Sequence, residues 1–276
     1  MKKPNKKQQQ RFEIIETIAL WEGVINASVL CHFIGVVARN AMTEIQAYNE
    51  FVPIPLEYNP SKKAFITPED FKPIFISTEW SVYHDHLMRF SHLYQGVLWT
   101  SGGIEVMPND FNKVEPDVIR AINECIKNQH SFKAKYHSMR HPRGLTRTFH
   151  PHAIAFNGIR WHMRAYSEEY GEFRDFNLSR IGRPSEHLSS HIERLDDHDW
   201  HTMLVLHLDA HPSLNLQQRK LVLTDYGQAD SFSYEIRAAM LKYFVKYYPI
   251  SISPDADPLD KPLFLKNHKE LSSFLL

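Results

Sequence analysis

Asn157-Gly-Ile-Arg-Trp-His-Met-Arg-Ala-Tyr166 is the stretch that decides the predicted fold of the middle of the chain. An Asn-Gly pair is the strongest short-range signal for a hairpin turn. The residues after the turn alternate with period two, as in a strand with two different faces. The two predicted faces carry Trp161, Met163 and Ala165 on one side and Arg160, His162 and Arg164 on the other. Three aligned cations repel one another unless an anion lies opposite, so this face is a candidate anion-binding surface.

Composition favours a globular protein. The 276 residues are 43% hydrophobic and 23% charged, and the net charge is zero, which is ordinary for soluble domains. Neutrality argues at first against a nucleic-acid partner. Between Lys133 and Arg183, however, there are ten Lys and Arg residues and only four acids. The local electrostatic field, which is positive here, decides which partner binds.

No targeting or membrane segment is evident. The basic start runs into glutamines rather than into an apolar core, so no signal peptide is predicted. The longest apolar stretch, about 28–38, is too short to span a bilayer. Cys31 and Cys125 lie far apart in apolar helical contexts and are interpreted as small buried hydrophobes. We therefore expect a cytoplasmic protein with no membrane partner.

The first third has the order of a winged helix-turn-helix. Helices are expected over 10–23, from Asn26, and over 37–49 after a turn at Gly35. Two β-prone runs, 56–58 and 64–67, follow as a basic-tipped hairpin, and a further helix is expected over 78–95. The candidate DNA-binding residues are Arg11, Asn26, Arg39, Asn40, Thr43, Gln46, Lys62 and Lys63. Such residue types suit base edges and phosphates, although the solvated face of any surface helix carries similar ones.

The rest of the chain predicts a small β-domain and an extension. A helix from Pro116 leads into strands at 131–137, 147–154, 158–166 and 173–181, which suggest a partly open barrel. A strand at 203–209 and helices at 217–224 and 232–247 follow. The predicted domains are residues 1–100, 113–185 and 190–276.

Polar residues gather on the predicted strands of the β-domain. The candidate ligand-binding residues are Tyr136, Ser138, Arg147, His152, Arg160, His162, Arg164, Arg174 and Arg180. Guanidinium groups bind phosphate bidentately, and an aromatic ring such as that of Tyr136 can stack on a base. The alternative is a solvated surface of ion pairs. That alternative is strong for Arg174, which adjoins Glu172 and Asp175, and weaker for Arg160 and Arg164, whose strand contains no acid.

Four segments carry a family resemblance: Lys133–Tyr136, Arg147–His152, Arg160–Tyr166 and Arg174–Ile181. Together they resemble a WYL domain, whose Trp-Tyr-Leu signature is Trp161-His162-Met163 in this chain. The Trp-His variant followed by Arg-Ala-Tyr is similar to the repressors associated with bacterial phage-defence systems of the BREX and CBASS types. The resemblance implies an α+β fold with an N-terminal winged helix-turn-helix, a central Sm-like WYL β-barrel and a C-terminal α/β dimerisation extension.

The resemblance also implies a function. It implies a homodimeric, non-enzymatic repressor of a phage-defence operon that binds an inverted repeat in double-stranded DNA. Its WYL domain would sense a nucleotide or a nucleic-acid fragment, without a cofactor. Since His162 stands where other members have Tyr, pocket charge would vary with pH near neutrality. A stripe of Ile236, Met240, Tyr243, Phe244 and Tyr247 on the last helix would serve as a dimer contact or as an internal core.

Two other classes stay open. A metal-dependent nucleic-acid hydrolase would use pairs such as His150 with His152, or His207 with His211. Zinc needs three or four convergent ligands, and 17 histidines make chance pairs common. The sequence shows no nucleophile elbow or phosphate loop, so no catalytic residue and no metal ligand is predicted. A single-stranded nucleic-acid-binding protein would suit the barrel but would leave the winged helix unexplained.

Overall fold

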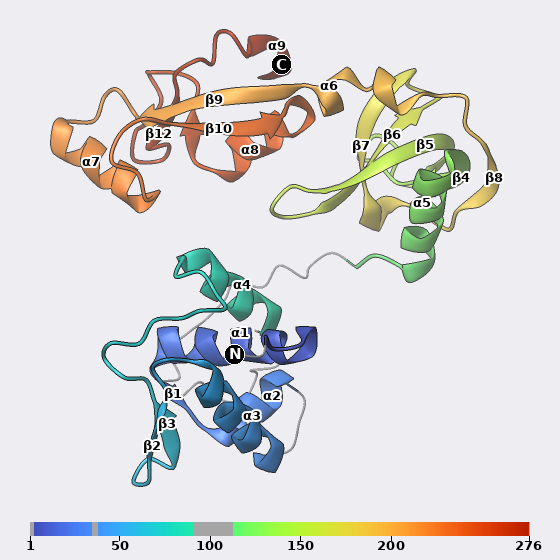
Figure 1. The fold of residues 1–276 in the computed structure, drawn as a ribbon. Coiled ribbons are helices and arrows are strands. Elements are labelled where there is room, and N and C mark those ends of the chain that lie inside the picture. The colour runs from blue at the N-terminus through green and yellow to red at the C-terminus, as the bar shows by residue number, and fades with distance from the viewer. Residues whose placement is uncertain (1–2, 35–37, 91–112, 276) are drawn as a thin grey trace. The chain divides into compact units, whose positions relative to one another are not determined.

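The computed structural model describes residues 3–34, 38–90 and 113–275. It forms two compact units, Met1–Pro108 and Asn109–Leu276 (Figure 1). The two later predicted domains both lie in the second unit. The predicted turn at Gly35 and the first predicted boundary near residue 100 lie outside the described residues.

Four helices and a small sheet make up the described part of the first unit. The elements are α1 (Lys6–Glu22), β1 (Val24–Ile25), α2 (Ala27–Ile34), α3 (Ala38–Phe51), β2 (Glu57–Asn59), β3 (Ala64–Ile66) and α4 (Trp80–Phe90). A capping box between Asn5 and Gln8 starts α1, and Gly23 ends it with a φ of 73°. The sheet has the order β1-β3-β2, and β2 and β3 project from the helices as the predicted hairpin (Figure 1).

A buried carboxylate fixes the segment after that hairpin. Glu16 of α1 is fully buried. Its oxygens accept hydrogen bonds from the backbone N–H groups of Ile74, Phe75 and Ile76 at 2.8, 2.6 and 3.1 Å, and from the Tyr48 hydroxyl at 3.0 Å. Four donors offset the cost of burying this acid. Glu16 therefore joins α1, α3 and the connection to α4 around one apolar core.

The second unit starts with the β-domain. Its elements are α5 (Pro116–Asn128), β4 (His130–Tyr136), β5 (Leu145–Phe156), β6 (Trp161–Ser167), β7 (Glu172–Asn177) and β8 (Ser185–Ser189). The strands pair in the order β7-β6-β5-β4-β8, so the sheet is open rather than a closed barrel. Met163 and Ala165 of β6 are fully buried in the core under α5, as the alternation predicts. Trp161, at the strand end, is 47% exposed.

The C-terminal part corrects one prediction. Its elements are α6 (His198–His201), β9 (Met203–Ala210), α7 (Leu216–Asp225), β10 (Phe232–Arg237), α8 (Leu241–Tyr247), β11 (Ile250–Ser251), β12 (Leu263–Leu265) and α9 (Ser272–Leu275). The helix predicted over 232–247 is wrong, because 232–237 form β10 and pair antiparallel with β9. Ile236 therefore lies on a strand, and only Tyr243, Phe244 and Tyr247 of the predicted stripe lie on α8. No helix of the described residues is long and apolar enough to span a membrane.

Candidate functional site

The helix α3 presents two contrasting faces. Ala41, Ile45 and Tyr48 are fully buried. The four predicted DNA contacts on this helix are all exposed, namely Arg39, Asn40, Thr43 and Gln46. The first turn and the middle of α3 therefore offer two amides, one guanidinium and one hydroxyl to solvent, as a helix that enters a major groove does.

The other four predicted DNA contacts are less uniform. Arg11 forms an ion pair with Glu44 of α3, so its charge is already compensated within the unit. The Asn26 side chain accepts a hydrogen bond from the Ser28 hydroxyl at 2.7 Å, next to the start of α2. Lys62 and Lys63 are exposed at the tip between β2 and β3. The hairpin tip, unlike Arg11, is available to a phosphate.

Arg164 and Asp197 form a buried, bidentate ion pair. Arg164 Nε and Nη2 donate to the two carboxylate oxygens of Asp197 at 2.7 and 2.8 Å. Arg164 Nη1 lies 3.4 Å from Asp175 Oδ1 of β7, directly opposite in register. His152 Nε2 donates to Asp197 Oδ2 at 2.7 Å. The ion-pair alternative, which looked weaker for Arg164 because its own strand contains no acid, therefore holds for this residue, whose acids come from outside the strand.

Burial and hydrogen bonding act in opposite directions on Asp197. Asp197 is 2% exposed, and burial alone would raise the pKa of its carboxyl group. The hydrogen bonds from Arg164 and His152 outweigh burial and hold that pKa well below its usual range. Asp197 also caps α6 by accepting from the Trp200 N–H. One carboxylate thus ties β5 and β6 to the start of the C-terminal part.

Four other predicted ligand contacts have partners within the chain. Arg174 pairs with Glu172 and lies 4.0 Å from the Tyr170 ring centroid, and Arg147 lies 4.5 Å from the same ring. The Tyr136 ring packs edge-on against Phe176 in the core, so it is not an exposed stacking surface. The Ser138 hydroxyl accepts from the His141 N–H in the turn after β4.

Arg160, His162 and Arg180 form a second group, which we call the cationic rim. His162 is 8% exposed, its ring stacks on Tyr243 at 5.2 Å, and its Nδ1 has no hydrogen-bond partner. Burial lowers the pKa of His162, Asp175 raises it, and the charges of Arg160 and Arg180 lower it further. Among the described residues no carboxylate forms an ion pair with Arg160 or Arg180. The two arginines of the rim therefore keep uncompensated charge, as does Arg147, which contacts the Tyr170 ring but forms no ion pair among the described residues.

Comparison with known proteins agrees with this architecture. Family models match residues 7–89 (BrxR transcriptional regulator winged helix-turn-helix domain), 117–185 (WYL domain) and 203–271 (BrxR transcriptional regulator, C-terminal dimerization domain). The DNA-binding transcriptional repressor CapW of Escherichia coli strain KTE188 is 30% identical over 97% of this chain and 92% of that protein. The chain belongs to the CapW family.

Two further CapW repressors agree with that assignment. The protein of Pseudomonas aeruginosa is 30% identical and that of Stenotrophomonas maltophilia 27% identical, each over 97% of this chain and 92% of the relative. Among solved structures, PafBC of Arthrobacter aurescens aligns with 98% of this chain and 46% of that chain, at 15% identity and a TM-score of 0.28. The CapW-family alignment therefore covers the winged helix, the WYL domain and the C-terminal part alike.

Sequence reasoning missed three residues around the Arg164–Asp197 ion pair. Asp197 lies in an acidic run beyond the predicted strands, and Asp175 was considered as an ion-pair partner mainly of the adjacent Arg174. Tyr243 was expected at a dimer contact or in an internal core, and its hydroxyl donates to Asp175 Oδ2 at 3.1 Å. The register of β6 and β7, had it been known, would have placed Asp175 opposite Arg164.

The predicted histidine pairs do not converge. His152 binds Asp197, whereas His150 Nδ1 lies 2.6 Å from the Ser190 hydroxyl and its Nε2 lies 3.0 Å from Glu168 Oε1. In the described part of the chain, the one group of three potential metal ligands is His150, Glu168 and His191, of which two are exposed. Those three could hold a metal ion, but they include only one member of a predicted pair.

The tip of the β5–β6 hairpin depends on a glycine. Gly158 has a φ of 89°, and a Cβ there would lie 2.4 Å from ring carbons of Tyr247. We expect Gly158→Ala to lower the free energy of unfolding of the second unit by about 2–4 kcal/mol, because backbone strain and overpacking add. Gly227→Ala is the matched control, since Gly227 also has a positive φ, 67°, but no atom within 4 Å of the added Cβ. If urea unfolding showed the same loss of unfolding free energy for Gly158→Ala and Gly227→Ala, the hairpin tip would not pack on α8.

Proposed function

We propose that this chain is a homodimeric repressor of a phage-defence operon, and that its WYL domain controls DNA binding through an anionic nucleotide or nucleic-acid fragment. The observation that carries the proposal is the near full-length similarity to repressors named as DNA-binding. The exposed polar face of α3 supports it, because Arg39 and Asn40 are residue types that read base edges. The match to a C-terminal dimerization domain supports two recognition helices on an inverted repeat.

DNA binding can be tested on the gene's own upstream region. In a gel shift, the full chain is expected to bind that duplex far more tightly than a scrambled duplex of equal length and composition. Affinity should fall steeply as salt rises, because phosphate contacts release counterions. Light scattering should give about twice the 32.4 kDa chain mass. Equal affinity for both duplexes would contradict a sequence-specific repressor and would favour a general nucleic-acid binder.

The cationic rim supports the sensory part of the proposal. Arg160 is exposed and Arg180 half-buried beside the neutral His162, so a phosphate there would meet two guanidinium groups without displacing a carboxylate. The ligand can change repression only if it binds the DNA-free and DNA-bound arrangements with different affinity. To raise the DNA-free arrangement from one per cent to 99 per cent of the protein, the ligand must bind it about 10⁴-fold more tightly than the DNA-bound arrangement.

The double variant Arg160→Ala/Arg180→Ala tests the rim. It is expected to keep operator affinity within about twofold and to lose derepression during phage infection, because only the phosphate contacts are removed. Operator affinity is measured by gel shift and derepression with a reporter gene. Arg120→Ala is the control, since Arg120 is an exposed arginine of α5 that pairs with Asp117. Normal derepression of the rim variant would mean that the ligand, if any, binds elsewhere.

A further inference from the structure

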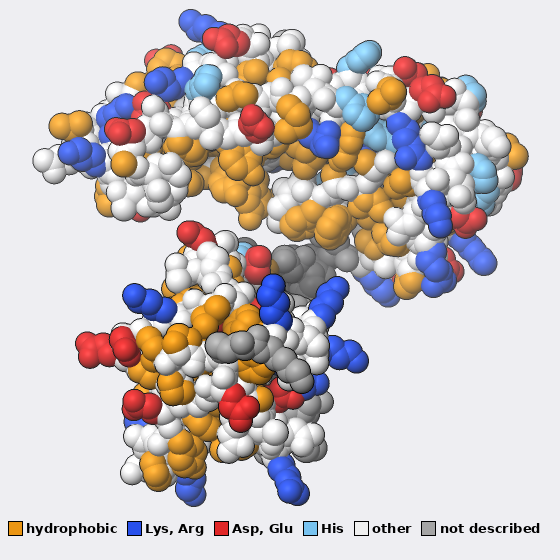
Figure 2. Space-filling view, in the orientation of Figure 1, with side chains coloured by type: hydrophobic (Ala, Val, Ile, Leu, Met, Phe, Trp, Pro, Cys, Tyr) orange, Lys and Arg blue, Asp and Glu red, His pale blue; other side chains and the backbone are white. Residues whose placement is uncertain are grey.

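An aromatic cavity lies next to the cationic rim. It has a volume of about 210 Å³ and lies between the tip of the β5–β6 hairpin and α8. Phe156, Asn157 and Gly158 line it from the hairpin, and Tyr234, Tyr243 and Tyr247 line it from β10 and α8. Hydrophobic side chains gather over α8 and this hairpin on the face shown in Figure 2.

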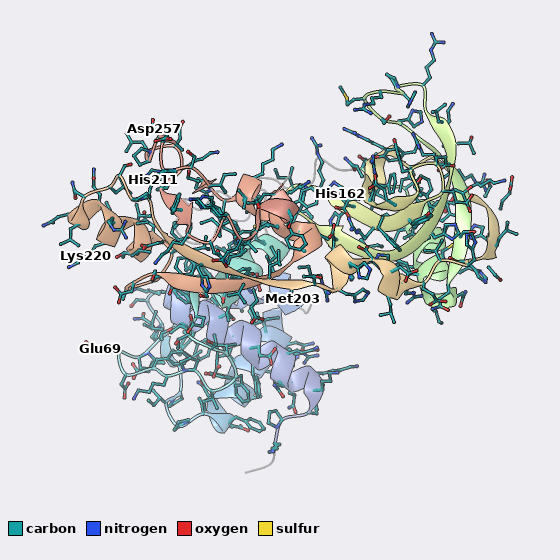
Figure 3. All side chains as sticks on the ribbon, turned by 90° about the horizontal axis from the view of Figure 1, so that it is seen from above. Glu69, His162, Met203, His211, Lys220 and Asp257 are labelled. Atoms are coloured by element: carbon teal, nitrogen blue, oxygen red, sulfur yellow. The ribbon has the colours of Figure 1, made fainter. Side chains whose placement is uncertain are left out.

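The cavity and the rim are continuous through one contact. Tyr243 lines the cavity and stacks on His162 at 5.2 Å. Arg160 follows the lining residue Gly158 by two positions, and Arg180 ends the short helical turn Leu178–Arg180, which contacts β6. Figure 3 labels His162 where the β-domain meets the C-terminal part. The Nδ1 atom of this 92% buried side chain has no hydrogen-bond partner, and a buried polar atom of this kind is usually satisfied by a ligand or water.

The size and the lining of the cavity select the kind of occupant. Pockets for drug-sized ligands are about 300–1,000 Å³, so about 210 Å³ suits one planar ring system rather than a whole nucleotide. Aromatic walls stack on bases of any sequence, and guanidinium groups at the mouth bind phosphate. An aromatic slot that Tyr243 joins to His162, with Arg160 two residues beyond the lining Gly158, therefore matches a base joined to a phosphate.

We propose that this cavity is the base-binding subsite of the WYL ligand, with the phosphate held by Arg160 and Arg180. This proposal rests on the sensory function proposed above. The base is stacked among Tyr234, Tyr243 and Tyr247, and His162 Nδ1 gains a polar partner at the mouth. Because the walls come from both the β-domain and α8, an occupied cavity couples the ligand directly to the C-terminal part.

Calorimetric titration of the full chain tests the subsite with defined probes. The probes are each of the four deoxynucleoside 5′-monophosphates, a four-residue single-stranded DNA and the base-free deoxyribose 5-phosphate. We expect at least one nucleotide probe to bind about tenfold or more tightly than deoxyribose 5-phosphate, since stacking is lost without a base. Preference for the oligonucleotide over every monophosphate would identify the ligand as a DNA end, and the reverse order would identify a free nucleotide.

Variants of the wall and of the rim separate the two halves of the site. Tyr247→Ala is expected to weaken nucleotide binding by about tenfold while deoxyribose 5-phosphate binding stays unchanged, and Tyr247→Phe should restore stacking. Arg160→Ala should weaken both kinds of probe. Tyr58→Ala is the matched control, since Tyr58 is equally exposed, at 50%, but lies in the first unit.

Three results would overturn the subsite. They are equal affinity for nucleotides and deoxyribose 5-phosphate, unchanged nucleotide binding by Tyr247→Ala, and an absence of binding by every nucleotide probe. A fourth would assign the cavity to a second copy of the chain, namely that Tyr247→Ala converts the protein to a monomer. Sensing itself is judged separately, by whether the oligonucleotide changes operator affinity of the wild-type chain in the gel shift. If the oligonucleotide changed the operator affinity of both the wild-type chain and Tyr247→Ala, the proposed function would stand and the subsite would be rejected.

Discussion

Asp197→Ala is expected to lower the free energy of unfolding of the second unit by about 3–5 kcal/mol, as breaking a buried ion pair does. The substitution leaves the Arg164 guanidinium, which is 6% exposed, with two more distant carboxylates, Asp175 at 3.4 Å and the exposed Asp199 at 3.9 Å. It also removes the hydrogen bonds to His152 and to the first turn of α6. Urea unfolding of the full chain measures the loss, and hydrogen exchange of β6 peptides assigns it to this unit.

The pH dependence of that loss identifies its cause. The pKa of Asp197 is depressed in the folded chain, so the carboxylate contributes stability at every pH above its unfolded pKa of about 3.9. That contribution is lost as the pH falls through the folded pKa. The difference between wild type and Asp197→Ala should therefore be constant from pH 5 to pH 8 and should shrink below about pH 4.

A neighbouring acid provides the control. Asp196 is exposed and makes no ion pair with Arg164, so Asp196→Ala should change stability by no more than about 0.5 kcal/mol. A loss below about 1 kcal/mol for Asp197→Ala at pH 7 would show that the ion pair is solvated rather than buried.

This ion pair also shows where sequence reasoning ends. The period-two pattern predicted β6 and the faces of Met163 and Arg164, because side-chain alternation is a local property of the strand. The carboxylate that neutralises Arg164 lies 33 residues further along the chain. No spacing rule connects these two residues, since the contact depends on how the chain returns to the sheet. The predicted cationic face therefore divides into a neutralised part and a rim.

Short or edge strands were the other source of error. β1 has two residues and β8 is wholly exposed, so neither carries a periodic apolar signal. Ile236 of β10 and the later Met240, Tyr243, Phe244 and Tyr247 also fit a helical spacing. Residues 232–237 form a strand because they pair with β9. Such pairing is a tertiary interaction, which the local sequence does not encode. The helices of the first unit were predicted well because their apolar faces and caps are local.

Arg39→Ala/Asn40→Ala is expected to weaken operator binding by about 2–6 kcal/mol, since each side chain that reads a base edge contributes about 1–3 kcal/mol of discrimination. Both residues lie exposed at the start of α3, away from its buried face, so the melting temperature should stay unchanged. A gel shift on operator and scrambled duplexes should show that the variant loses most of its preference for the operator while weak general binding persists.

Lys62→Ala gives the contrasting result that makes the first one interpretable. Lys62 is exposed at the hairpin tip, where a cation meets phosphate rather than bases. Its loss should weaken binding to both duplexes alike and reduce the slope of log affinity against log salt by about one. If the α3 variant instead behaved like Lys62→Ala, this helix would contact only the backbone, and sequence would have to be read by another element. Unchanged operator affinity of the α3 variant would remove α3 from the DNA interface altogether.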